Sequence, residues 1–267
     1  MSADALKRNN VKVSGRGTQP MLFAHGFGCD QNMWRYVTPA FAEDHRVVLF
    51  DYVGAGGSRV EAYDAQRYGA LRGYATDVLE ICEALDLHDV IFVGHSVSSM
   101  IGVLAANREP ERFARLVLVA ASPCFRNEPP AYAGGFERAQ LEELLDGMER
   151  DDMAWARYLA PLVAGNPDRP QLADEVEASF CATDRWIARR FAEVTFLSDC
   201  RRDLPRVRVP SLVLQCADDV LAPEAVGTYL HRHLTGSTLR RLPVSGHAPH
   251  LSHPVETTAA IREYLAA

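Results

Sequence analysis

The chain has 267 residues, of which 48% are hydrophobic and 24% charged, as in a globular protein with one large domain or a core carrying an inserted subdomain. Its formal net charge of −7 argues against nucleic acid as a main partner, because a phosphate backbone requires a basic surface. Apolar runs are too short for a membrane span, residues 1–10 lack a signal-peptide core, and the cysteines form no C-x-x-C pair. We therefore expect a cytoplasmic protein without membrane association, disulfides or structural metal.

Short apolar runs alternate with helical patterns along most of the chain. In chain order, the predicted strands are residues 21–24, 47–50, 90–93, 116–119, 212–215 and 238–242. Most are continuously apolar, as expected for parallel strands covered on both faces, whereas the last is more polar and fits an edge. Helical spacing of apolar residues is found over 74–85, 100–107, 226–233 and 261–265. This alternation predicts an α/β fold with a doubly wound, mostly parallel sheet.

The alternation stops after residue 123 and resumes at about residue 209. The intervening segment contains four helical patterns, residues 136–150, 153–163, 172–183 and 185–197, separated by Pro, Gly or Asp. An all-helical block between two strands predicts a cap over the carboxyl edge of the sheet, where open α/β sheets bind ligands. We therefore predict a core of residues 1–123 and 204–267 with a helical cap at 124–203.

A serine lies between a predicted strand and a predicted helix, in the sequence Gly94-His95-Ser96-Val97-Ser98. A tight turn there exposes the hydroxyl, and the helix N-terminus supplies free N–H groups and the positive end of a dipole. Ser96 could merely cap the helix. Its context is nevertheless that of the nucleophile elbow of α/β-hydrolases, G-x-S-x-G, with Ser98 in place of the last glycine. We predict that Ser96 is a catalytic nucleophile.

A nucleophilic serine needs a histidine base and an orienting carboxylate, which follow it in this order in α/β-hydrolases. The strand at 212–215 leads into Asp218 and Asp219. Successive side chains at a strand end point in opposite directions, so only one can face the histidine; Asp219 is preferred and Asp218 is the alternative. After the last strand, a Ser-Gly turn precedes His247, the predicted base, and His250 is the less favoured alternative.

The segment His25-Gly26-Phe27-Gly28 directly follows the first predicted strand. Glycines let the backbone turn there and point N–H groups into the site. The N–H groups of Phe27 and Val97 are the predicted oxyanion hole, and such donors lower the barrier of acyl transfer. His25 and His95 flank the two motifs and are expected to be hydrogen-bonded structural residues.

The histidines at 247, 250 and 253 are spaced by three, but Pro249 and Pro254 oppose the helix that would align them, so no metal site is predicted. We expect no cofactor.

Three segments resemble one α/β-hydrolase subfamily, namely residues 25–31 (HGFGCDQ), 94–100 (GHSVSSM) and 134–137 (GGFE). This subfamily contains the bacterial stress-response regulator RsbQ and the plant karrikin and strigolactone receptors, and it has a serine where Ser98 stands. The resemblance extends from about residue 10 to the C-terminus. It implies a V-shaped four-helix cap over a mostly apolar pocket. It also implies an acid four residues before a proline, which matches Asp219 and Pro223.

The resemblance further implies that three cap aromatics, Phe136, Trp155 and Phe196, line the pocket and contact the substrate. The other cap aromatics are expected to pack within the cap; they are Tyr158, Phe180, Trp186 and Phe191. The predicted function is a serine esterase that slowly cleaves small apolar esters or lactones through an acyl-enzyme. The alternative is a small-molecule sensor that engages a signalling partner protein. Serine at the elbow disfavours dehalogenase and epoxide hydrolase chemistry, which use aspartate there.

Overall fold

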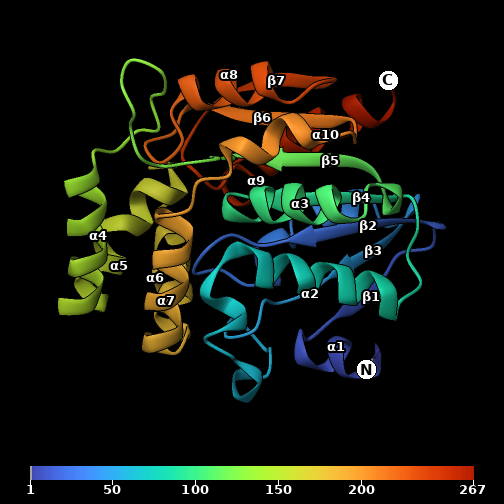
Figure 1. Cartoon of the computed structure of the whole chain (residues 1–267), viewed down its shortest axis with the longest axis horizontal. Coiled ribbons are helices and arrows are strands. Elements are labelled where there is room, and N and C mark those ends of the chain that lie inside the picture. The colour runs from blue at the N-terminus through green and yellow to red at the C-terminus, as the bar shows by residue number, and fades with distance from the viewer. Residues whose placement is uncertain (1) are drawn as a thin grey trace.

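A seven-stranded sheet forms the centre of the structure, a computed structural model that describes residues 2–267 (Figure 1). The strands are β1 (Lys12–Ser14), β2 (Gln19–Ala24), β3 (His45–Leu49), β4 (Val90–His95), β5 (Phe113–Val119), β6 (Ser211–Asp218) and β7 (Ser237–Ser245). Their order is β1-β3-β2-β4-β5-β6-β7, and all neighbours are parallel except the pair of β1 with β3. The predicted mostly parallel α/β sheet is therefore confirmed.

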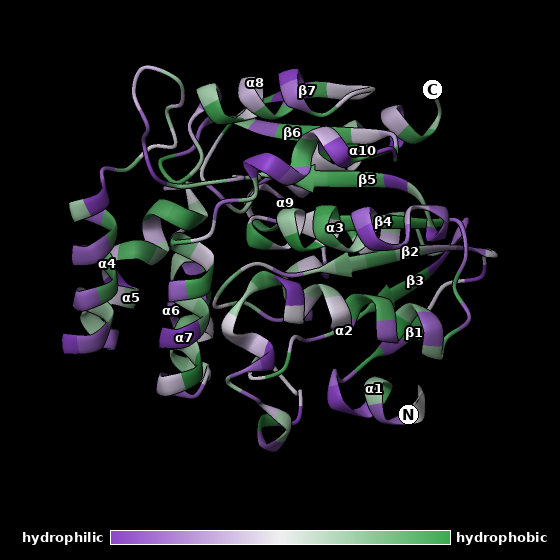
Figure 2. Cartoon of the chain, in the orientation of Figure 1, coloured by the Kyte–Doolittle hydropathy of each residue, from purple (hydrophilic) through white to green (hydrophobic). Residues whose placement is uncertain are grey.

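The central strands are buried on both faces, which explains their continuous apolar sequences. Every residue of β4 is buried, and β2 is buried from its second residue onward. In Figure 2 these strands have hydrophobic colours over most of their length. The edge strand β7 alternates between exposed and buried residues in its second half, as its more polar sequence suggested. The short strand β1 was not predicted, because its three residues are all exposed and carry no apolar pattern.

Helices cover both faces of the sheet. One face packs against α2 (Leu71–Ala84), α3 (Val97–Arg108) and α8 (Glu224–His233). The other packs against α10 (Pro254–Leu265), which follows the short α9 (Pro249–Ser252). The N-terminal helix α1 (Ser2–Arg8) was also not predicted. It lies against α2, where Arg8 contacts the fully buried Asp77 at 3.0 Å, so a charge pair anchors it.

Four helices lie between β5 and β6 in the chain: α4 (Arg138–Arg150), α5 (Asp152–Ala164), α6 (Gln171–Ala182) and α7 (Arg185–Phe196). We call these four helices the cap. In Figure 1 they stand beyond the end of the sheet toward which the arrow of β5 points. They begin and end where the sequence signals it: Asp151 and Asp184 accept N–H groups at the starts of α5 and α7, and Gly165 ends α5 in the left-handed region.

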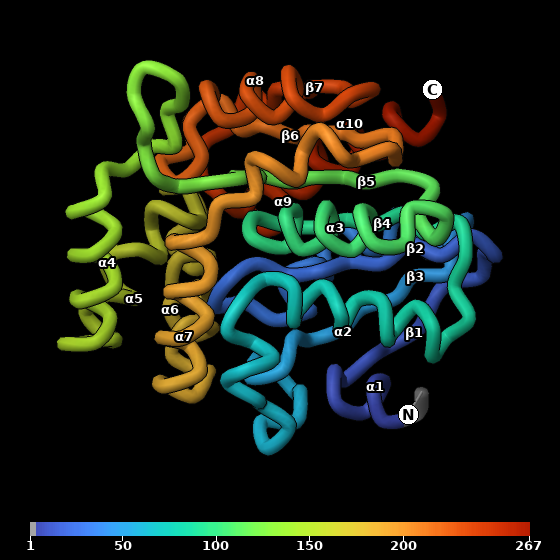
Figure 3. Tube along the Cα trace, in the orientation of Figure 1, coloured from blue at the N-terminus to red at the C-terminus, as the bar shows by residue number. Residues whose placement is uncertain are grey.

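The two connections between core and cap run side by side. The tube in Figure 3 follows the chain out of β5 into α4 and back from α7 to β6. Cys124 on the outgoing connection forms an antiparallel bridge with Asp199 on the returning one, and the Cys200 N–H donates to the Pro123 carbonyl at 2.8 Å. A hydrophobic cluster continues from the cap into the core loops, joining Trp155 and Leu145 to Leu221. The cap therefore packs on the loops at the carboxyl ends of the strands.

Candidate active site

Ser96 occupies a strained turn between β4 and α3. Its φ of 54° is in the region that side chains rarely adopt, at a typical cost of about 1–3 kcal/mol. The turn is tight because Gly94 has no side chain: a Cβ there would lie 2.7 Å from the backbone of Ser98. The Ser96 N–H donates to the Val119 carbonyl at 2.8 Å, which ties the turn to the neighbouring strand β5. The elbow thus presents the Ser96 hydroxyl at the carboxyl edge of the sheet.

The structure brings Ser96, His247 and Asp219 together in one hydrogen-bonded chain. His247 Nε2 lies 2.7 Å from Ser96 Oγ, and His247 Nδ1 lies 2.8 Å from Asp219 Oδ2 and 3.0 Å from Oδ1. Because the carboxylate accepts the Nδ1 proton, Nε2 is free to accept the proton of the serine hydroxyl. All three residues are at most 5% exposed. The arrangement is that of a nucleophile, a base and an orienting acid.

Asp219 is also hydrogen-bonded to its own loop. Its Oδ1 also accepts the N–H groups of Leu221 and Ala222, at 2.9 and 3.1 Å. By contrast, Asp218 is exposed at the end of β6, and His250 is buried beside Trp34 with ring centroids 4.2 Å apart. The hydrogen bond to Ser96 comes from His247, and the one to that histidine comes from Asp219. The preferred residues, and not their alternatives, thus form the chain.

The cap reaches the loop that carries His247. The N–H groups of His247 and Ala248 both donate to the Val163 carbonyl near the end of α5, at 2.9 and 3.0 Å. Close to this contact, two glycines approach each other: a Cβ on Gly165 would lie 2.2 Å from the Gly246 Cα. From the core side, His95 Nε2 lies 2.8 Å from the His247 carbonyl oxygen. Cap and core together therefore fix the backbone on which the imidazole is mounted.

The two predicted oxyanion donors lie on either side of Ser96. Val97 is the first residue of α3, so its N–H has no acceptor within the helix. The Phe27 N–H has no hydrogen-bond acceptor among residues 2–267, and the preceding Gly26 lies against Ser96, since a Cβ on it would be 3.4 Å from the Ser96 Cβ. Two unpaired N–H groups beside a serine can stabilise negative charge on an oxygen bound there.

The Phe27 side chain is surrounded by cap aromatics. Its ring centroid lies 6.1 Å from that of Trp155, 5.9 Å from that of Phe196 and 5.7 Å from that of Phe191. Two of the predicted substrate contacts, Trp155 and Phe196, are therefore buried against the same loop that carries the Phe27 N–H. The third, Phe136, is partly exposed and borders a groove with Trp155.

This groove, of about 810 Å³, lies between α4 and α5 and reaches the loop after β6. Its apolar walls come from Phe136, Leu144, Trp155, Leu159 and Leu221. Leu221 is the second residue after Asp219, which brings the groove to the loop of Asp219. Ser96, His247 and Asp219 are not among its lining residues, and the polar residues Gln140, Glu143, Arg150 and Asp151 also line it.

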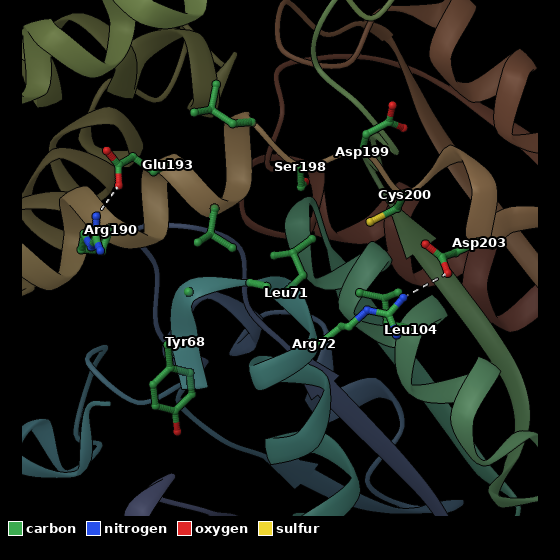
Figure 4. A pocket seen from close by; sticks show the side chains of 14 residues that line it. Tyr68, Leu71, Arg72, Leu104, Arg190, Glu193, Ser198, Asp199, Cys200 and Asp203 are labelled. Atoms are coloured by element: carbon green, nitrogen blue, oxygen red, sulfur yellow. Dashed lines mark hydrogen bonds and ion pairs between the residues drawn. The ribbon is translucent and has the colours of Figure 1, made fainter. Parts of the chain in front are cut away.

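A second hollow, of about 440 Å³, lies between α7 and the core and is shown in Figure 4. It separates α7 from the start of α2, and an ion pair stands on each side: Arg190 with Glu193 at 3.1 Å, and Arg72 with Asp203 at 3.9 Å. Its lining comes from α2, α3, α7 and the returning connection rather than from the loops of Ser96, Asp219 and His247. It is distinct from the site described above.

The expectation for the remaining cap aromatics was only partly right. Phe180 is buried and packs on Trp155 with centroids 5.3 Å apart. Phe191 instead stacks on Tyr74 of the core at 4.4 Å, so it joins cap to core. Tyr158 and Trp186 are 70% and 55% exposed, so the prediction that they pack within the cap was wrong. Trp186 contacts Tyr63 of the core with ring centroids 5.4 Å apart, and aromatic character alone did not distinguish either residue from buried neighbours.

The histidines that flank the motifs are hydrogen-bonded, as expected. His95 contacts the His247 carbonyl, and His25 contacts the Gly26 carbonyl at 2.8 Å. Burial lowers the pKa of both, and it lowers the pKa of His250 to about 3. The site thus contains three neutral imidazoles close to the base His247. Sequence reasoning did not find the hydrogen bonds that join the Ser98 hydroxyl to the His25 carbonyl and the Tyr52 hydroxyl.

Within residues 2–267, no group of three or more His, Cys, Asp and Glu side chains is arranged to hold a metal ion. None of the helices in the described part of the chain combines the length and apolar composition that crossing a membrane requires.

Comparisons with known proteins show which proteins the chain is similar to. The model of the alpha/beta hydrolase family matches residues 21–261. The chain is 40% identical to the karrikin insensitive 2 receptor CA of Petunia hybrida, over 92% of this chain and 91% of that receptor. It is 39% identical to the strigolactone esterase D14 of Arabidopsis thaliana, over 97% of each. Among solved structures, a hydrolase from Oleispira antarctica superimposes with a TM-score of 0.95 and 42% identity, covering 99% of this chain and 97% of that one.

Proposed function

The chain belongs to the alpha/beta hydrolase family, and from this premise we propose that it hydrolyses small apolar esters or lactones with Ser96 as nucleophile. The observation that carries the proposal is the hydrogen-bonded chain from Ser96 Oγ through His247 to Asp219, with contacts of 2.7 and 2.8 Å. Such a chain serves to activate a serine hydroxyl that is otherwise a weak nucleophile.

In the proposed first step, His247 Nε2 takes the hydroxyl proton as Ser96 Oγ attacks the substrate carbonyl carbon. Negative charge develops on the carbonyl oxygen, where the N–H groups of Phe27 and Val97 stabilise it. Asp219 holds the tautomer of His247 and stabilises the imidazolium that forms. His247 then gives its proton to the departing alcohol oxygen, which leaves an acyl group on Ser96.

In the second step, water attacks the acyl carbonyl while His247 accepts a proton from it. The same two N–H groups stabilise the second tetrahedral intermediate, and collapse returns the proton to Ser96 and releases the acid. No other group is required by this scheme, because every proton is taken up and returned by His247.

The proposed substrate class rests on the apolar surroundings of the site. Trp155 and Phe196 pack on Phe27, whose neighbour Gly26 lies against Ser96, and the groove bordered by Phe136 is apolar on most of its walls. We propose that residues 124–203 act as a lid on a core of residues 1–123 and 204–267, with Phe136, Trp155 and Phe196 contacting the substrate. A small apolar ester or lactone fits such a pocket better than a peptide does.

A second candidate function is a small-molecule sensor that acts on a partner protein. The chain is similar to the karrikin insensitive 2 receptor CA, whose name describes a receptor. The structural observation that favours this candidate is the direct link from the cap to the His247 loop, through the Val163 carbonyl. A ligand bound at Ser96 would shift the His247 loop and, with it, α5. A partner protein would then recognise the altered outer surface of the cap.

Steady-state hydrolysis of p-nitrophenyl butyrate by the wild type and the Ser96→Ala variant tests the hydrolase proposal. We expect turnover by the wild type and a loss of about 10³-fold or more in the variant. Equal turnover by both would contradict the proposal. If the wild type hydrolyses the ester while a cellular response to the ligand persists in Ser96→Ala, sensing is separate from hydrolysis.

A further inference from the structure

The peptide bond between Gly26 and Phe27 is held by its carbonyl group. His25 Nδ1 lies 2.8 Å from the Gly26 oxygen, and the Cys29 N–H donates to the same oxygen at 3.3 Å. A carbonyl oxygen has two lone pairs, so both of its acceptor positions are used.

The tautomer of His25 follows from its other neighbour. The Tyr52 N–H donates to His25 Nε2 at 3.1 Å. A backbone N–H can only donate, so Nε2 carries no proton and the neutral ring has its proton on Nδ1. His25 is fully buried, and this burial lowers its pKa, which keeps the ring neutral. His25 therefore donates from Nδ1 to the Gly26 carbonyl.

Fixing this carbonyl also fixes the Phe27 N–H. The Gly26–Phe27 bond is trans, and in a trans peptide the C=O and N–H bonds point in opposite directions. With the carbonyl directed toward His25 and Cys29, the Phe27 N–H is directed away from them. It has no acceptor among residues 2–267, and the adjoining Gly26 lies against Ser96.

The preceding peptide is held by Ser98. The Ser98 hydroxyl donates to the His25 carbonyl. Because its single proton is used there, the Tyr52 hydroxyl, 3.0 Å away, must donate to Ser98 Oγ. Ser98 is fully buried, and it stands where the usual elbow has glycine, which has no hydroxyl to offer.

We propose that His25 and Ser98 are positioning residues that lock the Gly26–Phe27 peptide with its N–H directed at the oxyanion. This inference rests on the proposed hydrolase function. If the peptide rotated, its carbonyl oxygen would face the developing negative charge, and one of two oxyanion donors would be lost. The His25 ring acts on this peptide and the Ser98 hydroxyl on the peptide before it, and neither side chain touches the substrate.

Two conservative variants separate the hydrogen bonds of His25. In His25→Asn, the amide nitrogen takes the place of Nδ1 and can still donate to the Gly26 carbonyl. In His25→Gln, the amide reaches toward the Tyr52 N–H instead and leaves the Gly26 carbonyl without this donor. His25→Leu removes both hydrogen bonds, and His88→Leu at an exposed histidine is the matched control.

The measurement is kcat and KM for p-nitrophenyl butyrate together with the inhibition constant of butylboronic acid. The boronic acid forms a tetrahedral adduct on Ser96 and so probes the oxyanion position directly. We expect His25→Leu and His25→Gln to lower kcat about 30-fold with little change in KM, because a lost oxyanion donor acts on the transition state. Boronic acid affinity should fall by the same factor, whereas His25→Asn and His88→Leu should stay near the wild type.

Ser98→Ala should lower kcat by about 3- to 10-fold, a smaller loss than in His25→Leu, since the His25 hydrogen bond to the Gly26 carbonyl remains. The pH at which kcat/KM is half-maximal should not move in any variant, because the contact of His247 with Asp219 is untouched. Wild-type kcat and boronic acid affinity in His25→Leu would overturn the inference. Equal losses in His25→Asn and His25→Leu would also overturn it, because the Gly26 contact would then not matter.

A crystal structure of His25→Leu separates this inference from the proposed function. If the wild type has no Ser96-dependent turnover, the proposed function fails, yet the orientation of the Gly26–Phe27 peptide in the variant still tests the lock. A rotated or disordered peptide supports it. An unchanged peptide overturns it.

Discussion

At the scale of single residues, the chemistry depends on which of two adjacent carboxylates faces the imidazole. The loop after β6 turns Asp219 inward, where its Oδ1 accepts two backbone N–H groups as well as contacting His247. Asp218 remains paired with β7 through its backbone, and its side chain is exposed. The same dipeptide therefore supplies one buried, hydrogen-bonded carboxylate and one solvated carboxylate.

This difference provides a matched pair of variants. Asp219→Asn should lower kcat by about 10³- to 10⁴-fold, because the amide no longer selects the tautomer in which His247 Nε2 can accept a proton. Asp218→Asn removes the same charge from the neighbouring position and should change kcat less than about 2-fold. Ester hydrolysis measured at pH 7.5, about one unit above the usual histidine pKa, compares them. Equal losses in the two variants would mean that Asp219 does not orient the base.

The buried imidazoles make the folded state sensitive to acid. The pKa of His250 is lowered from 6.5 to about 3, because burial disfavours its charged form. Between these two values the unfolded chain binds a proton that the folded chain does not, so the free energy of unfolding falls as the pH is lowered from about 6.5. His25 and His95 act in the same direction.

We expect His250→Phe to reduce this sensitivity. Phenylalanine can keep the ring contact with Trp34 without a titrating group. Thermal unfolding between about pH 7 and pH 4 should show a shallower fall of Tm in this variant than in the wild type. His88→Phe, at a side chain that is 67% exposed, is the control and should leave the slope unchanged. A parallel fall in all three proteins would contradict the assignment.

At this scale, sequence reasoning located the candidate residues because each one follows a strand at the carboxyl edge of the sheet. The order of Ser96, Asp219 and His247 along the chain suggested the group. Asp218 and His250 stayed open as alternatives, and the hydrogen bonds in the structure join the preferred residues. The hydrogen bonds of Ser98 were not foreseen, and His95 was expected to be hydrogen-bonded but without a stated partner. These bonds join groups that are brought together only by the tertiary fold.

At the scale of elements, the end of α5 supports the base. The Val163 carbonyl accepts two N–H groups from the loop of His247, in the last turn of the helix. This contact requires the close approach of Gly165 and Gly246, both with positive φ, of 58° and 94°. Gly165 thus ends α5 and also lets the end of the helix approach the loop of His247.

Gly165→Ala should therefore impair both activity and stability. Its Cβ would meet the Gly246 Cα at 2.2 Å and would have to adopt a left-handed φ. We expect the free energy of unfolding to fall by more than about 1 kcal/mol and kcat to fall with it, as the His247 loop shifts. Urea unfolding and ester kinetics measure the two effects. Gly69→Ala, where nothing lies within 4 Å of the added Cβ, is the control.

The elements themselves were predicted where their periodicity was strong. The central strands and the four cap helices have long apolar patterns, and capping residues such as Asp151 and Asp184 mark the breaks. β1 and α1 were missed because a short exposed strand and a charge-anchored helix carry no such pattern. Tyr158 and Trp186 were misplaced because aromatic character does not show which side of a helix is buried; both are more than half exposed, although Trp186 contacts Tyr63 of the core.

At the scale of the whole molecule, the structure has its cap docked on the core. Phe27 lies among the cap aromatics, and Phe191 stacks on Tyr74 of α2. A two-pronged ion pair between Arg35 of the core and Glu175 of α6, with both contacts at 2.6 Å, adds a polar tie. Ser96 is only 5% exposed in this arrangement, so we expect a substrate to reach it when the cap moves.

The ion pair offers a way to loosen the cap without touching the site. Arg35→Ala and Glu175→Ala should each raise amide hydrogen exchange in α6, and the double variant should show a coupling of about 0.5–1 kcal/mol. The pair is partly exposed, with side-chain exposures of 27% and 33%, so salt should reduce this coupling. Additive effects in the double variant, or unchanged exchange in α6, would contradict a role of this pair in holding the cap.

The central claim is that Ser96 is a nucleophile activated by His247. Labelling by phenylmethylsulfonyl fluoride, followed by mass spectrometry of the peptide that contains Ser96, tests it most directly. The account predicts one sulfonyl group on Ser96, loss of ester hydrolysis in proportion to labelling, and little labelling in His247→Ala. An unlabelled Ser96 in a protein that still hydrolyses esters would contradict it.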